Sequence, residues 1–313
     1  MAGLVAIWLL VSSVWMGGAI SFQLFHPYLT VFECVASASP VGLTLSAWLG
    51  LLLKSILFSE VEGLSWGLGF TCSCIQSIIA ALLTHSITKQ WDKRTSKYFQ
   101  YTYRHLKWCL LLIILPLTVW FIYIHYTHSL LKHDDKYYVG GTVYGDMPFH
   151  LMVINSFLFG VNSKAAPFIG RSVKAAFFAD SPLVYPYIPD FHAALIAGSG
   201  SSLHFALMYP GILLCFSFLM LLYFLNLRLT SSVKAAAISV PIIVMCGGTG
   251  AIQWLLFDQT YSGFRSVDHI LVDSLTRQIS FCWFSLPAHI LLPQRTTQFA
   301  YPVSLIALIL IIR

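Results

Sequence analysis

Charge is scarce in this chain. Only 10% of its 313 residues are Asp, Glu, Lys or Arg, whereas about one quarter of a soluble globular protein is charged. Acceptor sites of the form Asn-x-Ser/Thr are absent, and the seven cysteines have neither metal-ligand spacing nor the pattern of a disulfide framework. With 58% hydrophobic residues, the composition excludes an ordinary soluble domain and indicates that lipid and other helices surround most of the chain. The net charge of +6 does not indicate a nucleic-acid partner, because the basic residues cluster between hydrophobic runs.

Hydrophobic runs long enough to cross a hydrocarbon core, about 20 residues each, predict the membrane spans. They lie at about residues 2–22, 40–58, 64–87, 108–130, 203–226, 235–256 and 297–312. No Lys or Arg precedes the first run, so we interpret it as a retained anchor rather than a signal peptide. The sequence therefore predicts an all-α, polytopic membrane protein with about seven transmembrane helices.

The distribution of basic residues predicts which loops face the cytoplasm. Between the third and fourth runs lie Lys89, Lys93, Arg94, Lys97, Arg104 and Lys107, against Asp92 alone. Under the positive-inside rule this loop and the short basic connection at 228–234 are cytoplasmic, which places the N-terminus outside. The chain divides into N-terminal spans with the basic loop, residues 1–107, and a membrane module, residues 108–313. Two long segments of that module then face outward, at about residues 128–202 and 257–296.

Most ionisable side chains outside the basic loop fall in these two outward segments. The first carries Asp134, Asp135, Asp146, Asp180, Asp190, His133, His150 and His192, and the second carries Asp258, Arg265, Asp268, His269, Asp273, Arg277, His289 and Arg295. Reactive groups gathered on one membrane face suit an enzyme, whereas a channel tends to place them inside its spans.

The most informative stretch is Gly145-Asp146-Met147-Pro148-Phe149-His150. The Asp-x-Pro pattern is typical of a helix start and would put Asp146 and His150 on one helix face. The apolar remainder would let this helix lie in the membrane surface, through Leu151, Ile154, Phe157 and Leu158. After a polar loop, residues 183–197 predict a second apolar helix with Asp190 as its N-cap. The outward loop is therefore expected to carry two amphipathic surface helices.

The order of these elements resembles the polytopic GT-C glycosyltransferases, especially their protein-mannosyltransferase-like branch. The matching pieces are Gly145-Asp146 with Phe149-His150, the turn at Asn162, Ser181-Pro182-Leu183-Val184-Tyr185-Pro186, and Asp190-Phe191-His192-Ala193-Ala194-Leu195 before the span that begins at Leu203. Leu291-Leu292-Pro293-Gln294-Arg295 is similar to a segment of uncharacterised bacterial relatives. The resemblance covers about residues 108–313. The chain departs from the family's Asp-Glu or Asp-x-Asp pattern, because Met147 follows Asp146, and three spans precede its acidic loop.

The resemblance implies transfer of a sugar from a polyprenyl-phosphate-linked donor to an acceptor on the non-cytoplasmic face. Asp146 would be the catalytic base or would orient the acceptor, because a carboxylate can deprotonate a hydroxyl group. Arg295, with Arg265 or Arg277 as alternates, would hold the lipid phosphate, because guanidinium stays charged and binds phosphate bidentately. His150, Asp190 and His192 would bind substrate, and a divalent cation held by Asp146, His150 and Asp190 is an alternative. The implied partners are the lipid-linked donor and membrane lipid, in the endoplasmic reticulum or a bacterial inner membrane.

Other interpretations stay open at the level of sequence. Asp146 and Asp190 could serve only as helix caps, and Arg295 could be an interfacial anchor that extends toward the lipid head groups. Broken helices at Pro116, Pro210, Pro241 and the Gly247-Gly248-Thr249-Gly250 run would instead suit a membrane transporter or lipid flippase. Members of the resembling family continue through several more spans, so an inactive truncated relative is a third hypothesis.

Overall fold

The computed structural model describes residues 2–59, 61–90, 106–133, 136–140, 143, 145–163, 173–245 and 286–312. These residues form an all-α protein with a small antiparallel hairpin of strands β1 (Leu131–His133) and β2 (Lys136–Tyr138). Its helices are α1 (Ala2–Phe25), α2 (Val31–Ile56), α3 (Trp66–Gln90), α5 (Leu115–Ile124), α6 (Met147–Leu158), α7 (Ile188–Gly198), α8 (Leu203–Thr230), α9 (Val233–Met245) and α12 (Arg295–Ile311). Wider π-helical turns flank α5 as η1 (Leu110–Ile114) and η2 (His125–Ser129), and η5 (Leu286–Leu291) precedes α12.

Five described segments are long and apolar enough to cross a membrane: Gly3–Phe25, Val31–Ile56, Trp66–Lys89, Leu106–Ser129 and Leu203–Thr230. The remaining two predicted spans correspond to the shorter apolar helices Val233–Met245 and Arg295–Ile311. The prediction of an all-α membrane protein is thus confirmed. The second predicted span was placed too late in the chain, because α2 begins at Val31 rather than at residue 40. A capping box explains the earlier start: Thr30 accepts a hydrogen bond from the Glu33 backbone, and the Glu33 carboxylate accepts one from the Thr30 backbone.

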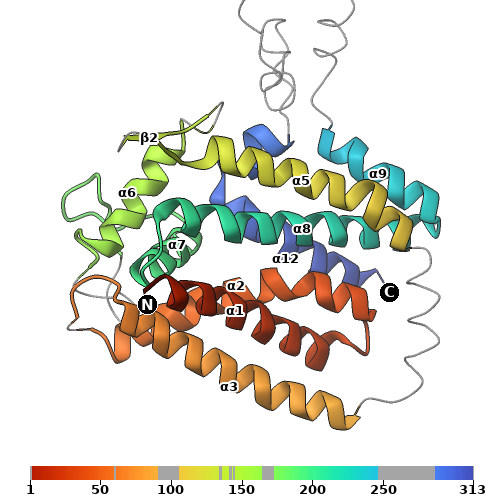
Figure 1. Cartoon of the computed structure of the whole chain (residues 1–313), viewed down its shortest axis with the longest axis horizontal. Coiled ribbons are helices and arrows are strands. Elements are labelled where there is room, and N and C mark those ends of the chain that lie inside the picture. Colours follow the sequence, from red (N-terminus) through yellow and green to blue (C-terminus); the bar gives the residue numbers. More distant parts are fainter. Residues whose placement is uncertain are drawn as a thin grey trace, which may run out of the picture.

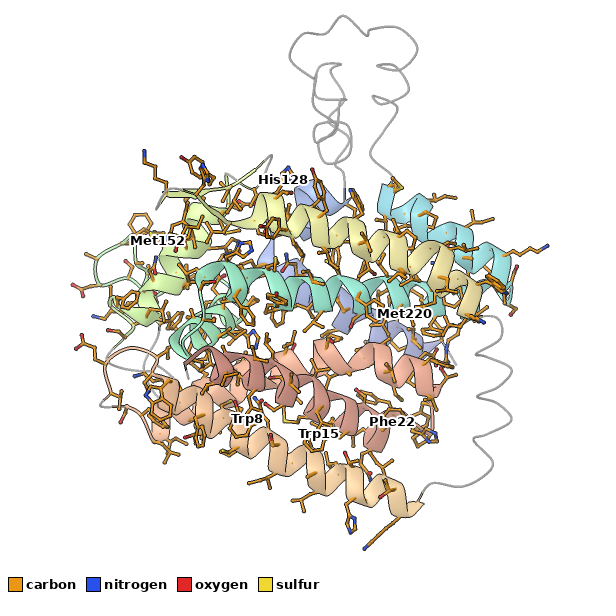
Figure 2. The ribbon with its side chains drawn as sticks, viewed as in Figure 1. Trp8, Trp15, Phe22, His128, Met152 and Met220 are labelled. Atoms are coloured by element: carbon orange, nitrogen blue, oxygen red, sulfur yellow. The ribbon has the colours of Figure 1, made fainter. Side chains whose placement is uncertain are left out.

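The long helices run side by side in layers (Figure 1). Helix α3 forms one outer layer, α1 and α2 the next, α8 and α12 the middle, and α5 and α9 the opposite outer layer. Figure 2 shows Trp8 and Trp15 of α1 between α1 and α3, where their indole N–H groups donate to Ser77 and Thr84, each over 3.2 Å. Because α8 lies in the middle layer, it is largely buried, and the other layers pack around it.

The two ends of the bundle differ in charge. Lys89 and Arg228 lie in the last turns of α3 and α8, and Lys107 and Lys234 lie at the starts of the segment Leu106–Ser129 and of α9. Figure 1 shows these four helix ends at one end of the bundle, here called the basic end. At this end Arg228 forms a bidentate salt bridge with the buried Glu33 carboxylate, donating from Nε at 2.7 Å and from Nη2 at 2.8 Å. This salt bridge connects the end of α8 to the start of α2. Helices α6 and α7 lie at the opposite end, together with the N-terminus of α1 (Figure 1). We call this the site end.

Helices α6 and α7 are packed into the bundle rather than laid on its surface. The apolar face predicted to contact the membrane surface is covered by protein, since Ile154, Phe157 and Leu158 are buried, and only Leu151 is partly open. Phe157 meets Phe191 of α7 edge to face with ring centroids 5.2 Å apart. The predicted surface location of α6 was therefore wrong, because α7 supplies the apolar partner that the sequence pattern alone assigned to lipid.

Candidate functional site

Three helix starts meet at the site end. Helix α6 has Asp146 at its N-cap position, α7 has Asp190 in its first turn, and α12 begins at Arg295 with Gln294 at its N-cap position. Prolines near the starts of α6 and α7, Pro148 and Pro189, suit the first helical turn, where a backbone N–H has no helical partner. The side chains of these starts bond to one another instead of capping their own helices.

Asp146 occupies the cap position without acting as a cap. Its side chain makes no hydrogen bond to the backbone of α6, and its Oδ2 accepts a 2.7 Å hydrogen bond from the Gln294 amide. The residue is half-buried. The simple helix-cap interpretation therefore does not describe this carboxylate, whose described partner lies on another helix start. Asp146 is left near the surface of the site end with one oxygen engaged.

Asp190 lies at the centre of a buried charged cluster. Both carboxylate oxygens contact His150 Nδ1, at 3.0 and 2.9 Å, and Oδ1 lies 2.9 Å from Arg295 Nε. Asp190, His150 and Arg295 are 0%, 1% and 2% exposed. Asp190 was predicted to be the N-cap of its helix, but Tyr187 holds that position and the carboxylate turns toward α6 and α12. Burial of a carboxylate is tolerated here because cationic or hydrogen-bonding partners surround it.

Arg295 is an interior residue and not an interfacial anchor. Its Nη2 donates a 2.9 Å hydrogen bond to the Pro189 carbonyl. Its Nε forms an ion pair with Asp190 but is not aligned with the carboxylate as a hydrogen-bond donor. The head group is thus held between the first turns of α7 and α12, which contradicts the alternative in which Arg295 extends to the lipid head groups.

His192 is fully buried on α7 and has unused polar atoms. Within the described residues neither ring nitrogen has a hydrogen-bond partner, and the ring packs edge to face on Phe299 at 5.8 Å. Burial, and to a smaller extent the positive charge of Arg295, lowers the pKa of His192 to about 3. The imidazole is therefore neutral and carries an unpaired donor and an unpaired acceptor next to Arg295.

Three neighbours of this site were not singled out from sequence. Gln294 is identified as a site residue only by its hydrogen bond to Asp146, although it directly precedes the predicted site residue Arg295. Tyr185 packs on His150, with ring centroids 6.0 Å apart. Burial is the largest cause of the raised pKa of Tyr185, and the negative charge of Asp190 is the second. A hydrogen bond with Thr296 lowers this pKa and so acts in the opposite direction. His125, at the start of η2, is buried near Cys215, with Nε2 and Sγ 3.7 Å apart, and is electrostatically coupled to Arg295. A histidine inside an apolar run was the available signal for the last of these.

The predicted metal alternative gains no ligand set. Among the residues that the structure describes, no group of three or more His, Cys, Asp or Glu side chains could hold a metal ion. His150 and Asp190 contact each other, and Asp146 is bonded to Gln294 instead of joining them. A cation at Asp190 would lie beside Arg295, whose positive charge opposes it.

The structure brings together His150, Asp190 and Arg295, places His192 beside Arg295, and joins Asp146 to this group through Gln294. The predicted phosphate contacts Arg265 and Arg277 lie outside the described residues, as do Asp134 and Asp135. Comparisons with models of protein families, with curated proteins and with solved structures find no match to this chain.

Proposed function

We propose that this protein is a membrane glycosyltransferase that moves a sugar from a polyprenyl-phosphate-linked donor to an acceptor on the non-cytoplasmic face. One observation carries the proposal. A carboxylate that does not cap its helix, Asp146, lies at the site end, and its amide partner Gln294 directly precedes Arg295, the guanidinium of the buried cluster. A base and a phosphate-binding cation are the two groups that such a transfer requires.

Asp146 would take the proton of the acceptor hydroxyl. Gln294 holds Oδ2 and thereby fixes the plane of the carboxylate, which leaves Oδ1 to face the acceptor. The acceptor oxygen then forms a bond to the anomeric carbon, and the bond between that carbon and the phosphate oxygen breaks. The leaving lipid phosphate keeps the electron pair. Asp146 is half-buried, so it is accessible to an acceptor in a way that the fully buried Asp190 is not.

Arg295 would stabilise the charge that develops on the departing phosphate. In the structure its charge is matched by Asp190, which also contacts His150. Because His150 would remain with Asp190, Arg295 can exchange the carboxylate for a phosphate without leaving Asp190 unpartnered. This exchange would make phosphate binding and rearrangement of the cluster a single event.

A membrane transporter or lipid flippase is the second candidate. One observation favours it: four ionisable side chains of α6, α7 and α12 are buried within the helical bundle at 2% exposure or less, namely His150, Asp190, His192 and Arg295. Buried ionisable groups in membrane proteins often mark substrate or ion pathways. The glycosyltransferase proposal is preferred because Asp146 supplies a half-buried carboxylate beside this cluster.

The experiment supplies the purified full chain, in lipid nanodiscs, with a panel of polyprenyl-phosphate sugars and candidate acceptors. Sugar transfer is expected, and Asp146→Asn should lower it by about 100-fold or more, the usual contribution of a general base. Glu62→Gln is the matched control, since Glu62 is an exposed acidic residue outside the helices. Full transfer by Asp146→Asn would show that the base is misassigned. Movement of the lipid-linked sugar across vesicles without consumption of donor would favour the transporter.

A further inference from the structure

A structured loop projects from the site end between α6 and α7. Residues 173–183 fold back on themselves, with Ala175 N donating to Ser181 O over 2.8 Å and Leu183 N donating to Val173 O over 2.6 Å. Asp180, with φ 56°, takes the left-handed conformation that closes the turn. The buried Asn162 side chain holds the start of the loop: its Nδ2 donates to the Lys174 carbonyl and its Oδ1 accepts from the Lys174 backbone N–H, at 2.9 Å each. The tip is therefore held in place by backbone hydrogen bonds.

This tip presents two phenyl rings to the surroundings. Phe177 is 44% exposed and Phe178 is 64% exposed, and Val184 at the foot of the loop is 92% exposed. Phe159 and Val161, at the end of α6, are also exposed. Exposing the large apolar side chains of an ordered loop to water is unfavourable. Their exposure on a membrane protein indicates an apolar contact that is absent from the isolated chain.

The two rings begin a continuous aromatic series that ends at the buried cluster. Ring centroids lie 5.0 Å apart from Phe178 to Phe177, 5.6 Å from Phe177 to Phe149, and 4.7 Å from Phe149 to Tyr185. Phe149 and Tyr185 then lie 5.8 and 6.0 Å from His150, which contacts Asp190. We call Phe178, Phe177, Phe149 and Tyr185 the aromatic ladder.

The ladder has an apolar end and a polar end. At the outer end Phe177 and Phe178 carry no hydrogen-bonding group, and Lys174 and Asp180 beside them point to solvent, 57% and 93% exposed. At the inner end Tyr185 carries a hydroxyl near Asp146, Asp190 and Arg295. A bound molecule with the same polarity would have a hydrocarbon chain along the phenyl rings and an anionic head group toward Arg295. A free sugar would leave its hydroxyls without partners at the outer rings.

We propose that the aromatic ladder binds the isoprenyl chain of a lipid phosphate next to its head group, with the Phe177–Phe178 tip in the head-group region of the outer leaflet. The proposal rests on the proposed function for the identity of the head group. Rings in tilted and edge-to-face contact expose π-faces to the double bonds and methyl groups of an unsaturated branched chain. The exposed Lys174 and Asp180 fix the depth of the tip, because both remain in the hydrated layer.

The test uses binding and does not require turnover. The full chain in nanodiscs is irradiated with a short isoprenyl phosphate that carries a diazirine on its terminal isoprene unit, and the labelled peptides are mapped by mass spectrometry. Label is expected on Phe177, Phe178 or Phe149, and competition by unlabelled polyprenyl phosphate should remove it. Phe178→Ala combined with Phe177→Ala should lower labelling by roughly tenfold, as expected for the loss of two aromatic contacts. Phe149→Leu, which keeps the apolar volume but removes the ring, should lower it several-fold.

Phe159→Ala is the matched control, because Phe159 is a phenyl ring at the site end that is even more exposed than Phe177 and Phe178 but is outside the ladder. Labelling that is insensitive to the ladder variants, or as sensitive to Phe159→Ala as to them, overturns the proposal. The two proposals fail separately. Ladder labelling without sugar transfer would keep the lipid-phosphate site and reject the glycosyltransferase, whereas transfer with label confined to other helices would do the reverse.

Discussion

Asp146 and Asp190 have similar positions in the sequence, each near the start of a short apolar helix that has a proline in its first turn, yet their surroundings differ. Asp190 is fully buried, and both of its oxygens contact His150 or Arg295. Asp146 is half-buried and its Oδ2 is bonded to the Gln294 amide. A carboxylate that is fully buried, with both oxygens already in contact with neighbours, is not accessible to an acceptor hydroxyl. In the proposed reaction the role of base therefore suits Asp146, and Asp190 suits the role of holding Arg295 and His150 in place.

The buried imidazole of His192 leads to a prediction about acid stability. Its pKa in the folded protein is lowered from 6.5 to about 3, first by burial and second by Arg295. The unfolded chain binds a proton near the ordinary pKa, and the folded protein does not bind it until the pH is far lower. The contribution of His192 to the free energy of unfolding should therefore be fully present above the pKa of the unfolded chain. It should decrease as the pH falls toward the pKa of the folded protein, by up to ~1.4 kcal/mol per pH unit.

His192→Leu tests this directly by detergent-induced unfolding over a pH series. The substitution removes both the titrating group and two buried nitrogens that have no described partner, so the acid slope should flatten and stability should rise by about 1 kcal/mol. His85→Leu is the control, because His85 is exposed near the end of α3 and its change should leave the slope intact. An acid slope that persists unchanged in His192→Leu would mean that other groups cause it.

The sequence predicted several site residues but not their pairing. Asp146, His150, Asp190, His192 and Arg295 were all singled out by residue type and by their place in outward segments. The Asp190–Arg295 contact joins residues far apart in the chain, and no local pattern specifies which helix start meets which. Gln294 was not chosen because an uncharged amide carries no signal until its partner is known.

At the element scale, α1 and α2 approach closely through small residues. A Cβ on Gly17 would collide with the Ala38 carbonyl, and a Cβ on Gly42 would collide with the Ser13 carbonyl. The buried Gln76 of α3 adds hydrogen bonds to this group, accepting from Ser12 at 2.7 Å and donating to Ser46 at 2.8 Å. Close backbone packing and interhelical hydrogen bonds are the two forces that associate helices in lipid, where hydrophobic burial contributes little.

We expect packing to dominate over hydrogen bonding in this group. Gly17→Ala and Gly42→Ala should each destabilise by roughly 2 kcal/mol or more, because backbone atoms must move apart. Gln76→Leu should cost about 1 kcal/mol, since single interhelical hydrogen bonds in membranes average ~0.6 kcal/mol. Gly18→Ala is the control: its Cβ would meet only the Ala38 Cβ at 3.5 Å, so the helix propensity of Ala should make it neutral or stabilising. Unfolding in mixed detergent, followed by circular dichroism, ranks the four variants, and a larger loss for Gln76→Leu would reverse this order.

Helix existence followed from hydropathy, whereas helix boundaries depended on local chemistry. Every predicted span has a helix in the described chain, but α2 starts earlier because the Thr30–Glu33 capping box precedes Pro40, which α2 accommodates. The buried position of α6 could not be predicted from its own pattern. A helix apolar on one face looks the same whether lipid or α7 covers that face, and only the packing of Phe157 on Phe191 distinguishes the two.

At the scale of the whole molecule, the two ends of the bundle are chemically different. The basic end gathers Lys89, Lys107, Arg228 and Lys234, and the site end gathers α6, α7 and the residue cluster around Asp190 (Figure 1). The sequence anticipated this separation through the spacing of basic residues along the chain. The structure shows that the basic end and the site end lie at opposite ends of the bundle. The positive-inside rule adds the expectation that the basic end is cytoplasmic.

Orientation is therefore the prediction on which a non-cytoplasmic site depends. Single-cysteine probes can be placed at exposed residues, Asp180→Cys in the loop at the site end and Lys234→Cys at the start of α9. In intact cells a membrane-impermeant maleimide should label the first and not the second, and permeabilisation should expose the second. The wild-type chain sets the background, because the cysteines it contains in the described spans are buried or partly buried. Labelling of Lys234→Cys but not of Asp180→Cys would place Asp146 in the cytoplasm, where a sugar donor of the proposed kind would have its head group on the opposite side of the membrane.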